Sequence, residues 1–146
     1  MKNVATIIIF SLTLFIASCK KDDNNNTTCT PTIVTVSTNI STPTVWADCN
    51  VYVISVNQIS VTSTLTIQPG AIIKFKEIAG DNAILVSNSG RILAEGTATK
   101  PILFTSYKDD ANGGDNNNDG TTTAPARYDW GGIIINSNNC NNFYSL

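Results

Sequence analysis

Short runs of alternating apolar residues recur along the chain, and this repeat constrains the fold more than any other feature. Residues 65–75 read LTIQPGAIIKF and residues 84–94 read ILVSNSGRILA, so each segment holds two strand-like runs around a glycine-containing turn. Further runs follow at 101–106 and 130–135. A period of about 20 residues predicts a solenoid, in which each coil buries half of its strands' surface against the next coil and parallel strands pair from coil to coil.

An antiparallel β-sandwich is the alternative, because it also contains many short strands separated by turns. The sequence favours the solenoid, since its glycine-containing corners recur at one interval. Hairpins would instead need Asn-Gly or Asp-Gly turns between adjacent strands. We therefore expect an all-β fold of the parallel β-helix type.

Two segments resemble a known family. Residues 64–75, TLTIQPGAIIKF, and residues 92–106, ILAEGTATKPILFTS, are similar to the opening coils of right-handed parallel β-helix proteins of the pectin-lyase-like type, common among Bacteroidetes surface lipoproteins. In that family an insertion ending in DWGGI, here residues 129–133, leads into the third coil. The resemblance covers about residues 51–137 and implies an N-terminal cap and the first two to three coils. It implies little about activity, because such coils occur in lyases, hydrolases, isomerases, adhesins and inert spacers.

The N-terminal residues 1–18 predict export and lipid anchoring. Lys2 precedes an apolar run from Val4 to Ile16, and small residues close it before Cys19. This run is too short to remain as a membrane-spanning helix. The segment resembles a bacterial lipoprotein signal peptide, which implies cleavage after residue 18 and acylation of Cys19, palmitate included. An ordinary secretory signal with an incidental cysteine is the alternative.

Residues 19–31 predict a flexible tether, because they are charged and then purely polar and have little apolar surface to bury. The sequence KKDD directly after Cys19 resembles the surface-export signal of Bacteroidetes lipoproteins. That resemblance implies anchoring in the bacterial outer membrane with the domain facing the cell exterior. A generic linker and a periplasmic location are the alternatives. Residues 32–146 then form the β-helix domain.

Composition excludes several classes of function. The chain has 9 Lys and Arg, 11 Asp and Glu, and no histidine. Its basic residues are scattered singly, so we expect no nucleic-acid partner. Without histidine, the Ser-His-Asp and Cys-His nucleophiles and the commonest zinc ligand are excluded. The acidic residues of the coils, Glu77, Asp81 and Glu95, are single rather than the facing pair that glycoside hydrolysis needs, so we assign no catalytic residue.

The cysteines other than Cys19 suit an oxidising compartment. Cys29 and Cys49 bracket the strand-like residues 33–36, and we expect them to form a disulfide that ties the tether to the first strands. Cys140 is then left without a partner in this chain.

An insertion at residues 107–129 is dense in Asn, Asp and Gly. Residues 115–120, DNNNDG, match the front half of an EF-hand-type loop, in which oxygens at positions one, three and five and a glycine at six surround one Ca²⁺ ion. The twelfth position lacks the bidentate glutamate, which predicts weak affinity, about 10⁻⁴–10⁻³ M. An ordinary turn-rich loop is the alternative, and no cofactor is required by the fold. We assign as candidate calcium ligands Asp115, Asn117, Asp119 and Asp129, with Asp109 and Asp110 as substitutes for the last.

Two functions fit these observations. The first is a non-catalytic surface lipoprotein, structural or adhesive, that presents a β-helix face to a glycan or protein ligand. The aromatic candidates for stacking on a sugar are Trp46, Tyr107, Tyr128 and Trp130, although Trp130 before two glycines also suits packing at a coil corner. The second is the N-terminal part of a β-helix polysaccharide lyase or hydrolase whose catalytic coils lie beyond Leu146. Residues 141–146 look like a strand beginning rather than a cap, which suggests a fragment of a longer protein.

Overall fold

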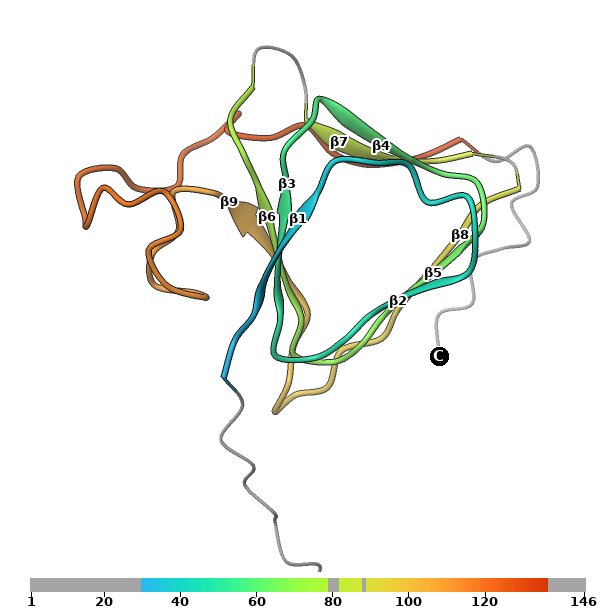
Figure 1. Ribbon diagram of the computed structural model, residues 1–146, viewed down its shortest axis with the longest axis horizontal. Helices are drawn as coiled ribbons and strands as arrows, with labels where there is room; N and C mark the ends of the chain where they lie inside the picture. Colours follow the sequence, from blue (N-terminus) through green and yellow to red (C-terminus); the bar gives the residue numbers. More distant parts are fainter. Residues whose placement is uncertain (1–29, 79–81, 88, 137–146) are drawn as a thin grey trace, which may run out of the picture.

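Ten short β-strands form the part of the chain that this computed structural model describes, residues 30–78, 82–87 and 89–136 (Figure 1). The predicted signal peptide, Cys19 and most of the predicted tether lie outside these residues. No helix capable of crossing a bilayer occurs in the described ranges. The strands are β1 (Ile33–Val36), β2 (Thr44–Trp46), β3 (Val51–Ile54), β4 (Gln58–Val61), β5 (Thr64–Ile67), β6 (Ile72–Phe75), β7 (Ala83–Val86), β8 (Arg91–Ala94), β9 (Leu103–Ser106) and β10 (Gly132–Ile135).

The strands form three parallel sheets, one for each wall of the solenoid. Their orders are β1-β3-β6-β9, β10-β7-β4 and β2-β5-β8, and every strand pairing is parallel. Figure 1 shows the three walls as a triangular outline with successive coils superposed. Since consecutive strands occupy different walls, the chain is a parallel β-helix and not an antiparallel sandwich, as the sequence predicted.

Two coils are complete, β3-β4-β5 and β6-β7-β8. Strands β1 and β2 precede them, and β9 and β10 follow. The interval between paired residues grows along the chain, from Val51 and Ile72 to Ile72 and Leu103, because the corner turns differ in length. The single period expected from the sequence therefore describes the first coils only.

Apolar residues stack in register inside the solenoid. Val36, Ile54 and Phe75 are paired neighbours on β1, β3 and β6, and all three are buried. Such ladders bury apolar surface without leaving a gap between rungs. At one corner Trp46 stacks on Tyr52, with ring centroids 4.8 Å apart and an interplanar angle of 13°.

The outer face of strands β3 and β6 is also buried. Side chains alternate between the two faces of a strand, so Val51 and Val53 point away from the interior that holds Ile54. Yet Val51 is fully buried and Val53 is 5 % exposed, and Lys74, the register partner of Val53, has no exposed surface. The insertion causes this burial, because Gly113 lies against Val51 and Lys74. In Figure 1 the insertion is the orange segment outside β9.

Candidate metal centre

The insertion leaves β9 through a tight turn around Ser106. The Asp109 amide donates to the Ser106 carbonyl at 3.1 Å. The Asp109 carboxylate is buried and accepts hydrogen bonds from Thr105 Oγ1 at 2.8 Å and Asn112 Nδ2 at 2.9 Å. Burial alone would raise the pKa of Asp109, but these hydrogen bonds and the Lys74 charge outweigh it and lower the pKa. Asp109 therefore holds the start of the insertion together as a carboxylate.

Lys74 supports the insertion from the wall beneath. Its Nζ donates to the carbonyl oxygens of Asp109 and Gly114, each at 2.7 Å. Burial lowers the pKa of Lys74, and the nearby Asp109, Asp110 and Asp115 charges oppose this effect. Sequence reasoning placed no function on Lys74, since a lone lysine in a strand is ordinarily a surface charge.

Three carboxylates converge above this support. Asp110, Asp115 and Asp119 can each place one oxygen within 4.8 Å of the other two, and we call these three residues the candidate metal centre. Backbone geometry brings them together, because the Asp115 carboxylate accepts from the Gly120 amide at 2.9 Å and the Asp119 amide at 3.3 Å. These bonds fold residues 115–120 into the compact turn expected for D-x-N-x-D-G.

Several side-chain oxygens at this loop are shielded from solvent and accept no hydrogen bond. The shielded oxygens without a hydrogen-bond partner include Asp110 Oδ1, Asn116 Oδ1, Asn117 Oδ1 and Asp119 Oδ1. Buried acceptors ordinarily have a donor, so a cluster of lone oxygens in one loop is unusual. Burial raises the pKa of Asp110, and the charges of Asp115 and Asp119 raise it further. A bound cation would give the oxygens of Asp110 and Asp119 a partner and relieve the repulsion among the three carboxylates.

The other polar atoms of Asn117 and Asp119 are already used. Asn117 Nδ2 donates to Thr123 Oγ1 at 3.1 Å, and Thr123 Oγ1 donates to Asp119 Oδ2 at 2.5 Å. This relay fixes the orientation of both side chains. It leaves Oδ1 of Asn117 and Oδ1 of Asp119 without a hydrogen-bond partner and available to a cation.

The structure thus brings together two of the four candidate calcium ligands, Asp115 and Asp119, and adds Asp110, which the sequence offered as a substitute. Asn117 belongs to the same turn through Thr123. Asp129 lies in a different set of contacts. Its Oδ2 accepts from the Ala126 amide at 2.9 Å, and its Oδ1 pairs with Lys108 Nζ at 3.2 Å.

Asp129 instead closes the exit of the insertion. Lys108 also pairs with Glu77 at 2.6 Å, so one ammonium joins the turn after β6 to the end of the insertion. Hydrogen bonds to Glu77 and Asp129 raise the pKa of Lys108. Burial alone would raise the pKa of Asp129, but hydrogen bonds from Ser106, the Ala126 amide and Lys108 lower it.

Cys49 takes part in a disulfide bond. The other cysteines of the chain, Cys19, Cys29 and Cys140, lie outside the described residues. The pairing of Cys29 with Cys49 therefore stays a prediction.

Three of the four aromatic residues that the sequence offered for stacking on a sugar already make contacts within the protein. Trp46 stacks on Tyr52 in the core, Trp130 stacks on Phe75 with centroids 4.2 Å apart, and the Tyr107 hydroxyl donates to the Asn116 carbonyl. Tyr128 is different, because it is 88 % exposed. The left-handed backbone at Tyr128, φ 72°, is uncommon for an aromatic residue. The Arg127 guanidinium lies 5.1 Å from the centre of its ring.

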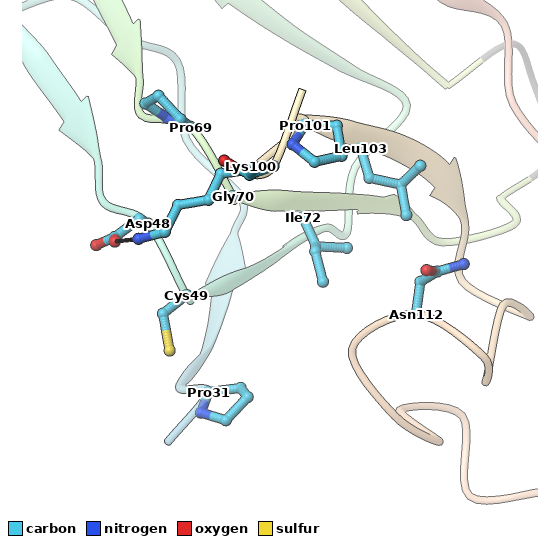
Figure 2. A pocket seen from close by; sticks show the side chains of 11 residues that line it. Pro31, Asp48, Cys49, Pro69, Gly70, Ile72, Lys100, Pro101, Leu103 and Asn112 are labelled. Atoms are coloured by element: carbon cyan, nitrogen blue, oxygen red, sulfur yellow. Dashed lines mark hydrogen bonds and ion pairs between the residues drawn. The ribbon is translucent and has the colours of Figure 1, made fainter. Parts of the chain in front are cut away.

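A mainly apolar hollow of about 380 Å³ lies where β1, β3, β6 and β9 begin, beside the insertion (Figure 2). Lys100 Nζ and Asp48 Oδ2 form an ion pair of 3.3 Å at its edge. The sequence did not indicate this hollow, because its lining comes from five segments that are separate in the sequence. The lining residues include Pro31, Cys49, Pro69, Ile72, Pro101, Leu103 and Asn112.

The three walls of parallel strands around one shared core place this chain in the class of parallel β-helix proteins. Residues 38–144 match the family model of the pectate-lyase-like β-helix domain, and the chain belongs to that family. No curated protein and no solved structure matches the chain.

Proposed function

We propose that this chain is a non-catalytic cell-surface lipoprotein, structural or adhesive, whose insertion binds one Ca²⁺ ion and whose β-helix contacts a glycan or protein ligand. The observation that carries the metal assignment is the set of solvent-shielded oxygens at the candidate metal centre that accept no hydrogen bond. The ion has a structural role in this proposal. It holds the insertion against the outside of the β-helix.

The spacing of the carboxylates supports calcium. Ca²⁺ binds oxygen ligands at about 2.3–2.6 Å, so two ligands on opposite sides of one ion lie about 5 Å apart. One oxygen from each of Asp110, Asp115 and Asp119 lies within 4.8 Å of the other two, so a single ion of this size can contact all three. Carboxylate and amide oxygens are also the donors that this hard cation prefers.

Two of the lysines that contact the insertion, Lys74 and Lys108, support a non-catalytic role. Lyase chemistry on a uronate would need an arginine or lysine that is able to take a proton beside the bound calcium. Lys74 is buried and donates to two carbonyls, and Lys108 is held between Glu77 and Asp129. Neither ammonium is presented to a substrate.

Calcium binding is tested by calorimetric titration of the full chain with CaCl₂. We expect a Kd of about 10⁻⁴–10⁻³ M. Asp119→Asn should weaken binding at least tenfold, because it removes a charged ligand. Asp48→Asn is the matched control, since Asp48 is an acidic residue outside the insertion. Absence of binding, or equal affinity in the two variants, would contradict the proposal.

Surface anchoring rests on the N-terminal sequence and is tested separately. The intact mass of the protein extracted from its native membrane should equal a chain beginning at Cys19 plus acyl groups. A mass without lipid would contradict the anchor. Protease added to intact cells should cleave the protein if the domain faces outward, whereas resistance until the outer membrane is opened would indicate a periplasmic location.

The pectate-lyase-like family favours one further candidate, a polysaccharide lyase or hydrolase of which this chain supplies the N-terminal coils. A native mass well above that of the acylated chain, together with cleavage of a uronate polysaccharide by the native protein, would support that candidate. A native mass equal to the acylated chain and no cleavage would support the non-catalytic role.

A further inference from the structure

We propose that Lys74 is the positioning residue of the candidate metal centre: its buried ammonium fixes the two backbone segments that present Asp110 and Asp115. This inference rests on the proposed calcium site. It adds that the site is organised by the β-helix wall before the ion arrives.

The contacts of Lys74 place it one residue away from two ligands. Its Nζ donates at 2.7 Å to the carbonyl oxygen of Asp109, directly before Asp110. It donates at 2.7 Å to the carbonyl oxygen of Gly114, directly before Asp115. One atom of β6 thus holds both peptide groups that lead into these carboxylates, and charge-assisted hydrogen bonds of this kind are short and directional.

The wall around Lys74 leaves the insertion little room to move. A β-carbon at Gly113 would lie 2.7 Å from Val51 Cγ2, 3.3 Å from Ile72 Cδ1 and 3.6 Å from Lys74 Cε. The backbone at Gly113 therefore rests directly on β3 and on β6, the strand that contains Lys74. The contact and the two hydrogen bonds act at the same point of the insertion.

Charge alone would give Lys74 the opposite effect on calcium. An ammonium near a cation site repels the cation, and the repulsion is strong where water is excluded. Val53, the register partner of Lys74 on β3, is a buried apolar residue at the matching outer position of the preceding coil. The Lys74 ammonium thus repels the ion, while its hydrogen bonds hold the ligands in place for the ion. Removing the ammonium shows which of these two effects on calcium affinity is larger.

The test is calorimetric titration of Lys74→Met with CaCl₂. Methionine has a similar length and suits the apolar contacts with Val51 and Ile72. If Lys74 positions the ligands, the Kd for Ca²⁺ should rise at least tenfold although a repelling charge has been removed. Lys76→Met is the matched control, because exposed Lys76 directly follows β6 and lies over the Tyr107 ring at 5.6 Å. The Kd of this control should stay within twofold of the wild type.

An unchanged or lower Kd in Lys74→Met would overturn the positioning role. If Asp119→Asn abolishes binding while Lys74→Met retains it, this inference fails and the proposed calcium site stands. If the wild-type chain binds no Ca²⁺, both fail.

A second measurement covers the case in which Lys74→Met does not fold. The wild-type chain, free of calcium, is treated with an acetylating reagent, and each lysine is followed by mass spectrometry. Lys74 should be protected while Lys76 is modified, because the insertion already covers Lys74 without the ion. Equal rates at the two lysines in the folded protein would overturn the inference.

Discussion

Gly113 of the insertion lies directly on Val51 of β3, so closely that a β-carbon at residue 113 would be 2.7 Å from Val51 Cγ2. The backbone there is left-handed, with φ 74°. Glycine is therefore needed at this position both for its backbone angles and for its lack of a side chain. This contact converts an outer wall of the β-helix into a second buried surface.

Gly113→Ala should destabilise the protein more than Gly114→Ala. Both residues have positive φ, so alanine costs about 1–2 kcal/mol of backbone strain at either one. Only residue 113 adds a clash, since nothing lies within 4 Å of a β-carbon at residue 114. Overpacking of this kind costs about 1–3 kcal/mol more. Chemical denaturation measures the difference, and equal losses in the two variants would mean that the insertion moves freely on the wall.

Trp130→Ala should lower the free energy of unfolding by about 3 kcal/mol. Trp130 stacks on Phe75 with ring centroids 4.2 Å apart and an interplanar angle of 7°, and it closes the coil directly before β10. Trp130→Phe keeps an aromatic ring at this position, so its loss of unfolding free energy should be less than half that of Trp130→Ala. Urea denaturation followed by circular dichroism checks both values. A neutral Trp130→Ala variant would show that the end of the insertion is not held by this stack.

Stability should fall in acid partly through Asp129. The folded-state pKa of Asp129 is lowered, so its contribution is present above the ordinary pKa of about 3.9 and is lost as the pH falls through the folded value. At pH 7, Asp129→Asn should therefore be less stable than the wild type by about 1–2 kcal/mol. The difference in Tm between the two proteins should shrink below about pH 4. A difference that is constant from pH 7 to pH 3 would contradict the assigned role of the carboxylate.

Calcium should stabilise the wild-type chain. With Kd near 10⁻³ M, CaCl₂ at ten times that concentration adds about 1.4 kcal/mol by mass action. Thermal denaturation should show a higher Tm in calcium than in a chelator. The shift should be less than half as large in Asp119→Asn and unchanged in Asp48→Asn. A shift of equal size with NaCl at matched ionic strength would indicate screening of the acidic residues rather than a bound ion.

The fold could be predicted from the sequence because a solenoid depends on local repetition. Residues 65–75 contain an alternating run, a glycine-containing turn and a second run, and these become the end of β5, its corner and β6. Stacking then follows from the need to bury one face of each strand. The lengths of the turns between walls could not be predicted. A short turn and a long turn are equally compatible with the stacked strands, provided that the next strand begins in register with its neighbour.

The candidate metal centre could be predicted only where its residues are close in sequence. Asp115 and Asp119 belong to one turn, so their spacing brings them together. Asp129 was a candidate because the EF-hand-type pattern lacks its last carboxylate ligand. In the structure the two oxygens of Asp129 instead bind the Ala126 amide and the Lys108 ammonium. Lys74 lies far from the insertion in sequence, and only the folded chain shows that the insertion returns to cover β6.

The burial of Val51, Val53 and Lys74 beneath the insertion has a consequence for protein engineering. The corner between β9 and β10 accepts many extra residues without loss of register, which would suit it as a grafting position for a foreign loop. Deleting the insertion, however, would uncover two valines and an unpaired lysine on a flat wall of strands, a surface prone to aggregation. A minimal β-helix built from this chain would need polar residues at positions 51 and 53 before the insertion is removed.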